Sequence, residues 1–273
     1  MMVAVNEIQP PQLKDHEFTL FQEFIYDAAG INLSDAKKAL VSGRLAKRLR
    51  ELGLSSYGDY FKLLKATASS ELQMAVDLLT TNETFFFREP KHFDFLRTQV
   101  LPTWVSGQRR IWSAASSSGE EAYTLAMVLA EHCPSDLWEI VGTDISLRMV
   151  NKARSGHYAM ERAESIPRNY LNNYCLRGTG SQEGTFLIDA SLRSRVQFNH
   201  ANLKTDLSQY GQFDVIFLRN VLIYFDMETK QQVVAKLLRQ LKSGGYIIVA
   251  HSESLTNVTD SVRMVVPSVY KKP

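Results

Sequence analysis

The stretch that decides the fold is RRIWSAASSSGEEAYTLAMVLAEH, residues 109–132. Residues 109–115 have the composition of a short buried strand, and residues 116–119 are three serines and a glycine, which favour a tight turn. In residues 120–132 the apolar side chains recur at the spacing of an amphipathic helix. This order of strand, turn and helix is the repeating unit of a doubly wound parallel sheet.

The same alternation continues toward the C-terminus. Residues 138–144 form a second apolar strand, which ends in Asp144, and residues 146–155 follow as a helix that Ser146 can cap. Further strands are predicted at residues 196–198, 213–218 and 246–250, with a helix over residues 227–241 before the last of them. We therefore expect an α/β fold of Rossmann-like topology, with an antiparallel edge hairpin over residues 262–271.

Two regions depart from this alternation. Residues 15–75 carry apolar side chains at helical spacing, as at Phe18, Phe21 and Ile25, and predict an all-helical domain. Residues 170–194 contain two strand-like segments around a glycine-rich turn, which predicts a small antiparallel insert. The expected organisation is a helical domain over residues 1–81, a linker over residues 82–98, and a larger domain over residues 99–273 that contains the insert.

Composition excludes several classes of protein. The chain has 273 residues with 31 Lys and Arg against 29 Asp and Glu, and its net charge of +2 and pI near 8.4 are too mild for a nucleic-acid-binding protein. It carries neither an export signal nor the roughly 18 consecutive apolar residues of a membrane span. Cys133 and Cys175 have no disulfide or zinc spacing, and none of the six histidines pair at metal-binding spacing. We expect a cytoplasmic protein that binds neither metal nor nucleic acid and does not insert into membranes.

The turn after the first predicted strand is the first candidate site, because ligands of open α/β sheets bind at the carboxyl ends of the strands. It has one glycine, and Glu120 and Glu121 would repel a phosphate at the start of the helix. The two glutamates would attract a ligand with an ammonium and a sulfonium group, although they can equally well complement the helix dipole alone. Asp144 lies 25 positions after Gly119, near the spacing at which an acid binds ribose hydroxyls. Together these features favour a nucleoside cofactor without phosphate.

Two further segments carry polar groups at informative places. The linker has three successive phenylalanines with Asn82, Thr84 and Arg88 beside them, and this pattern fits either a cleft or packing between domains. Arg219, Asn220 and Tyr224 follow the predicted strand at residues 213–218, where active-site groups belong, although a tyrosine there can also serve packing.

Five ordered motifs resemble those of the CheR family of chemotaxis receptor methyltransferases: TTNETFFFREP (residues 80–90), WSAASSSGEEAY (112–123), GTDIS (142–146), RNVLIYFD (219–226) and HSES (251–254). The likeness covers nearly the whole chain. The chain departs from the usual pattern at Ser116, where many members have Cys or Ala, and at Ala250, where Gly is usual. The resemblance implies a class I methyltransferase sheet and transfer of a methyl group from S-adenosylmethionine to glutamate side chains of methyl-accepting chemotaxis receptors, which forms glutamyl methyl esters.

The resemblance also implies the site residues. The cofactor would be bound by Asn82, Thr84, Arg88, Glu121, Asp144, Asn202, Leu203, Arg219 and Asn220. Arg88 and Tyr224 would lie nearest the transferred methyl group. We assign Arg88 to orienting the substrate carboxylate, and Tyr224 to placing the carboxylate or the cofactor through its hydroxyl.

Two surfaces are candidates for receptor binding. Arg44, Lys47 and Arg48 lie on one face of a predicted helix over residues 36–52, and this face either docks glutamate-bearing receptor helices or is simply solvated. Arg177, Gly178 and Gly180 lie in a turn that resembles the one with which some family members bind a C-terminal receptor tail; the alternative is a plain hairpin. We expect a monomer.

Two rival classes share parts of this pattern. A Rossmann-like methyltransferase that acts on another carboxylate or on RNA would have the cofactor turn but no reason to carry the motif at residues 80–90. A non-catalytic receptor adaptor would lose Arg88, Asp144 or Tyr224, and all three are present.

Overall fold

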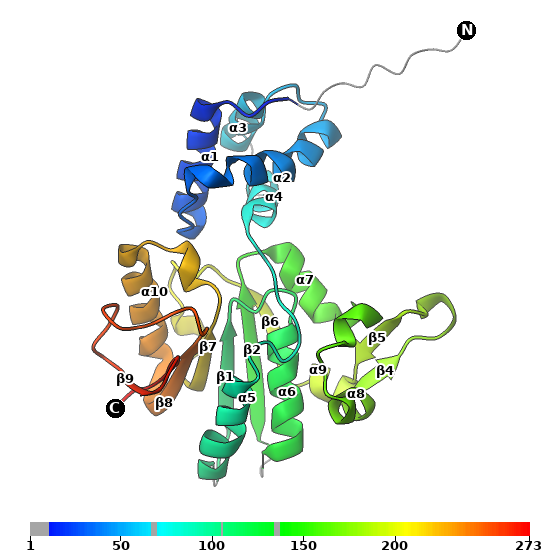
Figure 1. The fold of residues 1–273 in the computed structure, drawn as a ribbon, viewed down its shortest axis with the longest axis vertical. Coiled ribbons are helices and arrows are strands. Elements are labelled where there is room, and N and C mark those ends of the chain that lie inside the picture. The colour runs from blue at the N-terminus through cyan, green and yellow to red at the C-terminus, as the bar shows by residue number, and fades with distance from the viewer. Residues whose placement is uncertain (1–10, 67–69, 105, 134–136) are drawn as a thin grey trace. The chain divides into compact units, whose positions relative to one another are not determined.

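The computed structural model describes residues 11–66, 70–104, 106–133 and 137–273. Contacts between residues divide the chain into two compact units, one that ends at Thr80 and one that begins at Thr81. Figure 1 shows the helices of the first unit in blue and cyan, and the strands of the second unit from green to red. No described helix is both long and apolar enough to cross a membrane.

The first unit is helical, as predicted. It comprises α1 (Asp15–Ala29), the 3₁₀ turn η1 (Asp35–Lys37), α2 (Lys38–Glu51), α3 (Tyr57–Ala66) and α4 (Ser70–Leu79). Phe21 is fully buried at its centre, and its ring packs against those of Tyr57 and Tyr60 with centroids 6.5 and 6.2 Å apart. The helix expected over residues 36–52 begins as η1 and continues as α2.

The second unit is built on a seven-stranded sheet with the order β6-β2-β1-β7-β8-β10-β9. The strands β1 (Arg109–Ala114), β2 (Trp138–Asp144), β6 (Val196–His200), β7 (Phe213–Leu218) and β8 (Leu241–Val249) pair in parallel. The strands β10 (Val269–Lys271) and β9 (Arg263–Val266) add to β8 as an antiparallel hairpin. The predicted α/β class and edge hairpin are therefore confirmed. Because the strand order reverses at β1, the switch point lies between β1 and β7.

Helices connect and cover these strands. The connecting helices are α6 (Glu120–His132), α7 (Leu147–Ser155) and α10 (Met227–Gln240). The shorter elements are α5 (Lys91–Phe95), the π-helical η2 (Leu96–Val100), α8 (Arg168–Tyr174), α9 (Ala190–Arg193), and the 3₁₀ turns η3 (Leu101–Thr103), η4 (Met160–Ala163), η5 (Gly180–Gln182), η6 (Ser208–Tyr210) and η7 (Leu222–Tyr224). Ser146 accepts a hydrogen bond from the backbone N–H of Met149, which confirms its predicted role as the cap of α7.

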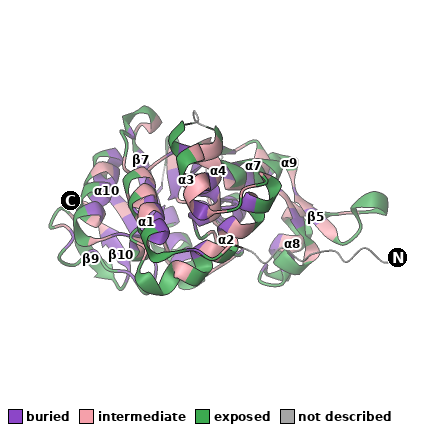
Figure 2. Cartoon of the chain, turned by 90° about the horizontal axis from the view of Figure 1, so that it is seen from above, coloured by how far each residue is buried: buried purple, intermediate pink, exposed green. Residues whose placement is uncertain are grey.

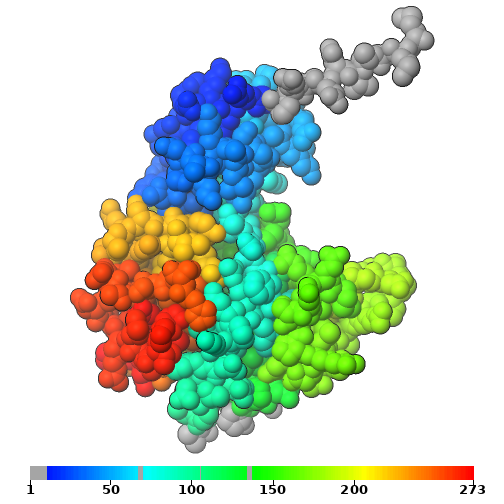
Figure 3. Space-filling view, in the orientation of Figure 1, coloured from blue at the N-terminus to red at the C-terminus, as the bar shows by residue number. Residues whose placement is uncertain are grey.

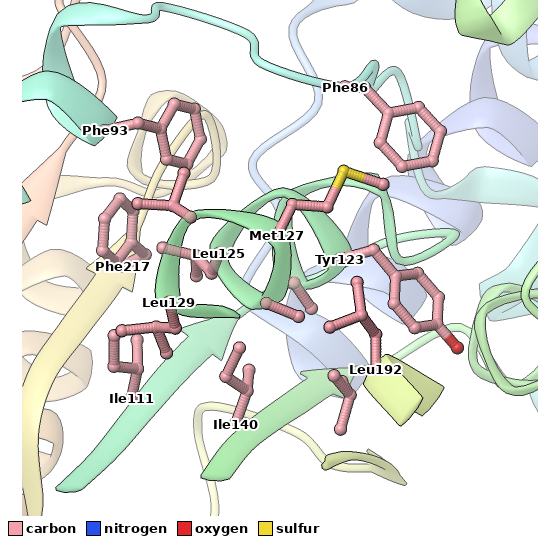
Figure 4. Close-up of a cluster of buried hydrophobic side chains, with 14 of the residues drawn as sticks. Phe86, Phe93, Ile111, Tyr123, Leu125, Met127, Leu129, Ile140, Leu192 and Phe217 are labelled. Atoms are coloured by element: carbon pink, nitrogen blue, oxygen red, sulfur yellow. The ribbon is translucent and has the colours of Figure 1, made fainter. Parts of the chain in front are cut away.

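Helix α6 lies in the core of the second unit. Figure 4 shows Leu125 and Leu129 of this helix beside Ile111 and Phe217 of the sheet, and all four side chains are fully buried. Burial of each such side chain contributes about 1.5–3 kcal/mol. The core therefore fixes the start of α6 at the carboxyl edge of the sheet.

The insert is larger than predicted, because it has a third strand. The strands β4 (Cys175–Arg177) and β5 (Thr185–Ile188) were expected, but β5 also pairs with β3 (His157–Ala159), outside residues 170–194. Three residues are too few to give a strand pattern in the sequence. The ring of Tyr158 stacks on Phe186 at 5.5 Å and meets Phe86 of the linker edge-on at 5.1 Å. These aromatic contacts hold the insert against the rest of the second unit. The turn of the insert, residues 178–184, is mostly exposed (Figures 2 and 3).

Candidate active site

The turn after β1 adopts an unusual backbone. Ala115, Ser117 and Gly119 have φ angles of 87°, 48° and 97°, so alternate residues occupy the left-handed region. Only one of them is a glycine, and the two others cost of order 1–3 kcal/mol of backbone strain each. A side chain at Gly119 would approach Ala153 to 2.9 Å. The turn thus has a glycine-like conformation that its composition does not reveal.

Asp144 holds this turn in place from the end of β2. Its Oδ2 accepts a hydrogen bond from the backbone N–H of Ser117 at 2.8 Å, and its Oδ1 accepts one from the N–H of Ser146, also at 2.8 Å. The side chain is buried at the carboxyl edge of the sheet. The structure therefore places Asp144 where the sequence predicted an acid beside the turn.

The two glutamates at the start of α6 have different environments. Glu120 is buried, its Oε2 accepts a hydrogen bond from Ser118 Oγ at 2.7 Å, and burial raises its pKa. The carboxylate of Glu121 accepts hydrogen bonds from Ser113 Oγ at 2.7 Å and from Arg219 Nη1 at 2.9 Å. Glu121 is therefore fixed in orientation at the carboxyl edge.

Arg219 joins three segments of the second unit. Besides Glu121, its guanidinium donates to the backbone carbonyl of Arg88 at 2.5 Å and lies 3.2 Å from Glu89 Oε2. It also lies over the ring of Phe93, 5.5 Å from the ring centroid. The side chain is almost completely buried, so this geometry describes a residue that positions Glu121 and the linker.

The linker packs within the second unit. Phe86 is fully buried, Phe87 packs against Phe93 and Tyr170, and only Phe85 is exposed. The Oγ of Ser117 donates to the carbonyl of Asn82 at 3.0 Å, which ties the linker to the turn after β1. A second set of contacts fixes the rest of the linker: Arg162 donates to the carbonyl of Thr84 at 2.6 Å, and Arg88 donates to the carbonyl of Glu83 at 2.9 Å.

The loops after β6 and β7 complete this edge. Asn202 follows β6, where its Oδ1 accepts from the backbone N–H of Lys204 at 3.0 Å, and Leu203 is buried beside it. Asn220 follows β7 with a φ of 58°, and the half-buried Tyr224 ends η7. The fold thus brings six of the predicted cofactor residues to the carboxyl ends of neighbouring strands: Glu121, Asp144, Asn202, Leu203, Arg219 and Asn220. Asn82, Thr84 and Arg88 belong to the linker.

Glu253 is a residue of this edge to which the sequence analysis gave no role. Its Oε2 accepts hydrogen bonds from the backbone N–H groups of Asn220 and Ala250 at 2.9 and 3.0 Å, and its Oε1 accepts from that of Ile223 at 3.2 Å. Burial raises the pKa of Glu253, and these N–H groups oppose that shift. One buried carboxylate therefore connects the loop after β7 to the loop after β8. The sequence signals are the HSES motif, which contains Glu253, and the place of this acid in a polar segment that follows a strand.

Two histidines that the sequence analysis treated as scattered come together in the fold. The rings of His92, in α5, and His251, after β8, have centroids 4.5 Å apart, and Glu89 lies beside both. Glu89 and His92 are three residues apart, but His251 is far from both in the sequence, so no spacing rule could indicate the complete cluster.

The predicted receptor-binding cations of the first unit have different surroundings. Arg44 donates to the carbonyls of Leu79 and Thr80 at 2.8 and 3.0 Å, at the end of α4. Two nitrogens of Arg48 donate to the two carboxylate oxygens of Glu71 at 2.9 and 2.5 Å. Lys47 is 79% exposed. Arg44 and Arg48 therefore stabilise the helical unit itself.

The predicted peptide-binding turn borders a cavity of about 390 Å³ in the insert, lined by residues that include Leu176, Arg177, Gly178, Thr185 and Leu187. A Cβ atom on Gly178 would lie 2.0 Å from the carbonyl oxygen of Gln182, so the turn itself requires this glycine. Gly180 has a φ of 58° with open space around it.

Comparison with known proteins shows which family the chain is similar to. Residues 16–80 match the family described as "CheR methyltransferase, all-alpha domain", and residues 82–270 match "CheR methyltransferase, SAM binding domain". Two relatives named chemotaxis protein methyltransferase come from Escherichia coli K12 (40% identity, covering 90% of this chain and 87% of the relative) and Salmonella typhimurium LT2 (37% identity, covering 98% and 94%). A solved magnesium protoporphyrin IX methyltransferase from Synechocystis PCC 6803 shares 13% identity over 70% of this chain and 64% of its own, with a TM-score of 0.35.

The fold and the matched domains define an S-adenosylmethionine-dependent methyltransferase. The donor set fits this cofactor, because carboxylates at the turn suit a cationic ligand with a ribose better than a phosphate. The chain belongs to the CheR methyltransferase family.

Proposed function

We propose that this family member methylates glutamate side chains of chemotaxis receptors to form glutamyl methyl esters. The observation that carries the proposal is the match of both family domains, together with relatives named chemotaxis protein methyltransferase that align with nearly the whole chain. The fixed carboxylates at the turn after β1 support the same conclusion, because they suit the cofactor of this reaction.

The chemistry requires positioning more than acid–base catalysis. A glutamate carboxylate, with a reference pKa near 4.3, is ionised at neutral pH, so no base is needed to activate it. Bound S-adenosylmethionine supplies an electrophilic methyl group on a sulfonium. The enzyme must hold a carboxylate oxygen about 3–3.5 Å from that carbon and in line with the sulfur.

We assign these tasks to residues at the carboxyl edge. Asp144 would accept hydrogen bonds from the ribose hydroxyls, and Glu121 would bind the ammonium group. Asn82, Thr84, Asn202, Leu203, Arg219 and Asn220 would complete the cofactor site. Arg88 would orient the substrate carboxylate, and Tyr224 would place the carboxylate or the cofactor. Because the guanidinium of Arg88 also lies 5.6 Å from the ring centroid of Phe85, its contact with the nucleophile can be partial, which preserves the reactivity of the carboxylate.

We also propose that the receptor docks on α2, and the contacts of its cations decide which substitution can test this. Reversing Arg48 would break its ion pair with Glu71, so a loss of activity in that variant could arise from unfolding. Lys47→Glu avoids this problem, and Lys62→Glu is a matched control because Lys62 is 81% exposed on α3. At low salt we expect Lys47→Glu to slow receptor methylation while Lys62→Glu does not. Equal rates would remove α2 from docking.

We also propose that the insert binds a receptor tail peptide along its open edge. In β4, Leu176 is exposed and Arg177 is available for a carboxylate of an added strand. Arg177→Ala should abolish micromolar binding of a tail peptide that ends in an aromatic residue, and Glu183→Gln in the same turn is the control. Fluorescence anisotropy measures both. Gly178 is not a suitable test position, because its substitution would distort the turn.

The proposed reaction is tested by methyl transfer from labelled S-adenosylmethionine to receptor-containing membranes, free small carboxylic acids and RNA. Label in the receptor alone is the expected result. Label in free acids or RNA would instead support a methyltransferase of another specificity, and no transfer with intact cofactor binding would support a receptor adaptor. We expect a cytoplasmic monomer, and light scattering on the purified protein checks the oligomeric state.

A further inference from the structure

Glu89, His92 and His251 form a compact cluster of potential metal ligands in the second unit. Glu89 Oε2 lies 3.5 Å from His92 Nδ1 and 4.0 Å from His251 Nε2, and one ligand atom from each residue lies within 4.8 Å of the others. His92 is 2% exposed, whereas His251 is 46% exposed. The cluster therefore has a buried side and a side open to solvent.

Ser268 contacts one nitrogen of the His92 ring. Its Oγ lies 2.8 Å from His92 Nε2 and 2.5 Å from the carbonyl oxygen of Pro267. The other ring nitrogen, Nδ1, faces Glu89.

His92 Nδ1 is buried and has no hydrogen-bond partner among the described residues. The nearest ligand atom of the cluster is Glu89 Oε2, 3.5 Å away, which is too far for a good hydrogen bond. A buried polar atom without a partner costs about 1–3 kcal/mol. A metal ion bound between the two side chains would satisfy both atoms.

We propose that Glu89, His92 and His251 bind one divalent transition-metal ion, and that Zn²⁺ is the ion they suit best. Two histidines and one carboxylate are a donor set that zinc accepts, with a fourth position left for water. A metal-binding histidine typically donates its second N–H to an oxygen, and Ser268 Oγ lies 2.8 Å from His92 Nε2, where it can accept that hydrogen bond. The exposed imidazole of His251 provides the path of entry and can rotate to shorten its distance to the ion.

Arg219 sets the strength of this site. Its guanidinium lies 3.2 Å from Glu89 Oε2 and therefore competes with a metal ion for that oxygen. Glu121 also pairs with Arg219, so two carboxylates share one guanidinium and the local charge stays negative. We therefore expect a dissociation constant in the micromolar range, weaker than that of a closed structural zinc site.

The experiment titrates Zn²⁺ into the chelator-treated 273-residue chain by calorimetry, with Co²⁺ absorption as a second readout of nitrogen and oxygen coordination. The wild type should bind one equivalent, and His251→Ala should weaken binding at least tenfold. His16→Ala is the control, because His16 is an exposed histidine of the first unit. Thermal unfolding without metal verifies that each variant is folded. Absence of saturable binding to the wild type, or equal binding by His251→Ala, would overturn the proposal.

Discussion

Glu253→Gln tests how the loops of the candidate active site are held. The carboxylate accepts three backbone N–H groups and is 8% exposed. A glutamine keeps one accepting oxygen and turns an NH₂ group toward N–H donors, so at least one of these bonds is lost. A hydrogen bond to a charged group contributes about 1.5–3 kcal/mol, so we expect the free energy of unfolding to fall by about 2–4 kcal/mol. In a unit of this size that lowers Tm by roughly 4–16 °C.

The same substitution should slow methyl transfer, because Asn220 and Ile223 belong to the loop that carries Tyr224. We expect kcat/KM to fall about tenfold or more, which corresponds to about 1.4 kcal/mol. Differential scanning calorimetry and initial rates measure the two effects. Glu164→Gln is the matched control, since Glu164 is exposed in the same unit. If Glu253→Gln matches the wild type in both Tm and rate, the carboxylate does not hold these loops.

Three further predictions address the cofactor turn and the buried histidine. Asp144→Ala should weaken the binding of S-adenosylmethionine and of its demethylated product by about 1.5–3 kcal/mol, as measured by calorimetry. An unchanged affinity would show that Asp144 does not bind the ribose. Ala115→Gly should raise the free energy of unfolding by about 1 kcal/mol, because the relief of backbone strain at a φ of 87° exceeds the cost of the extra entropy of the unfolded chain. Denaturant titration measures this change, and a lower free energy of unfolding in the variant would contradict the prediction. Because burial lowers the pKa of His92 in the folded state to about 4, the unfolded state binds the extra proton first, and stability should fall as the pH drops from about 6.5 to 4. His92→Gln should flatten that part of the pH profile of unfolding measured in chelator, and an unaltered slope would assign it to other groups.

The sequence was sufficient for the parallel sheet, because strand and helix periodicities alternate clearly from residue 109 onward. It was sufficient for the position of Asp144, because an acid at a strand end needs no tertiary information. The strand β3 was missed because its three residues show no pattern and its pairing with β5 comes from tertiary structure.

Other features depend on backbone angles and on distant pairs. The residue types alanine and serine do not predict the left-handed φ angles of Ala115 and Ser117. The ion pair of Arg48 with Glu71 forms because α2 packs on α4. The sequence of α2 alone therefore suggests more unpaired positive charge for a binding partner than the folded unit offers. His92 and His251 meet only because α5 and the loop after β8 lie at the same edge of the sheet.

The most direct test of the central claim is the chemical identity of the product. After incubation of a chemotaxis receptor with the enzyme and methyl-labelled S-adenosylmethionine, brief exposure to alkali hydrolyses esters and releases labelled methanol, whereas N-methyl groups stay attached. We predict that the receptor-bound label is released as methanol and that mass spectrometry places it on glutamate. Label that survives alkali, or that lies on residues other than glutamate, would contradict the proposed function.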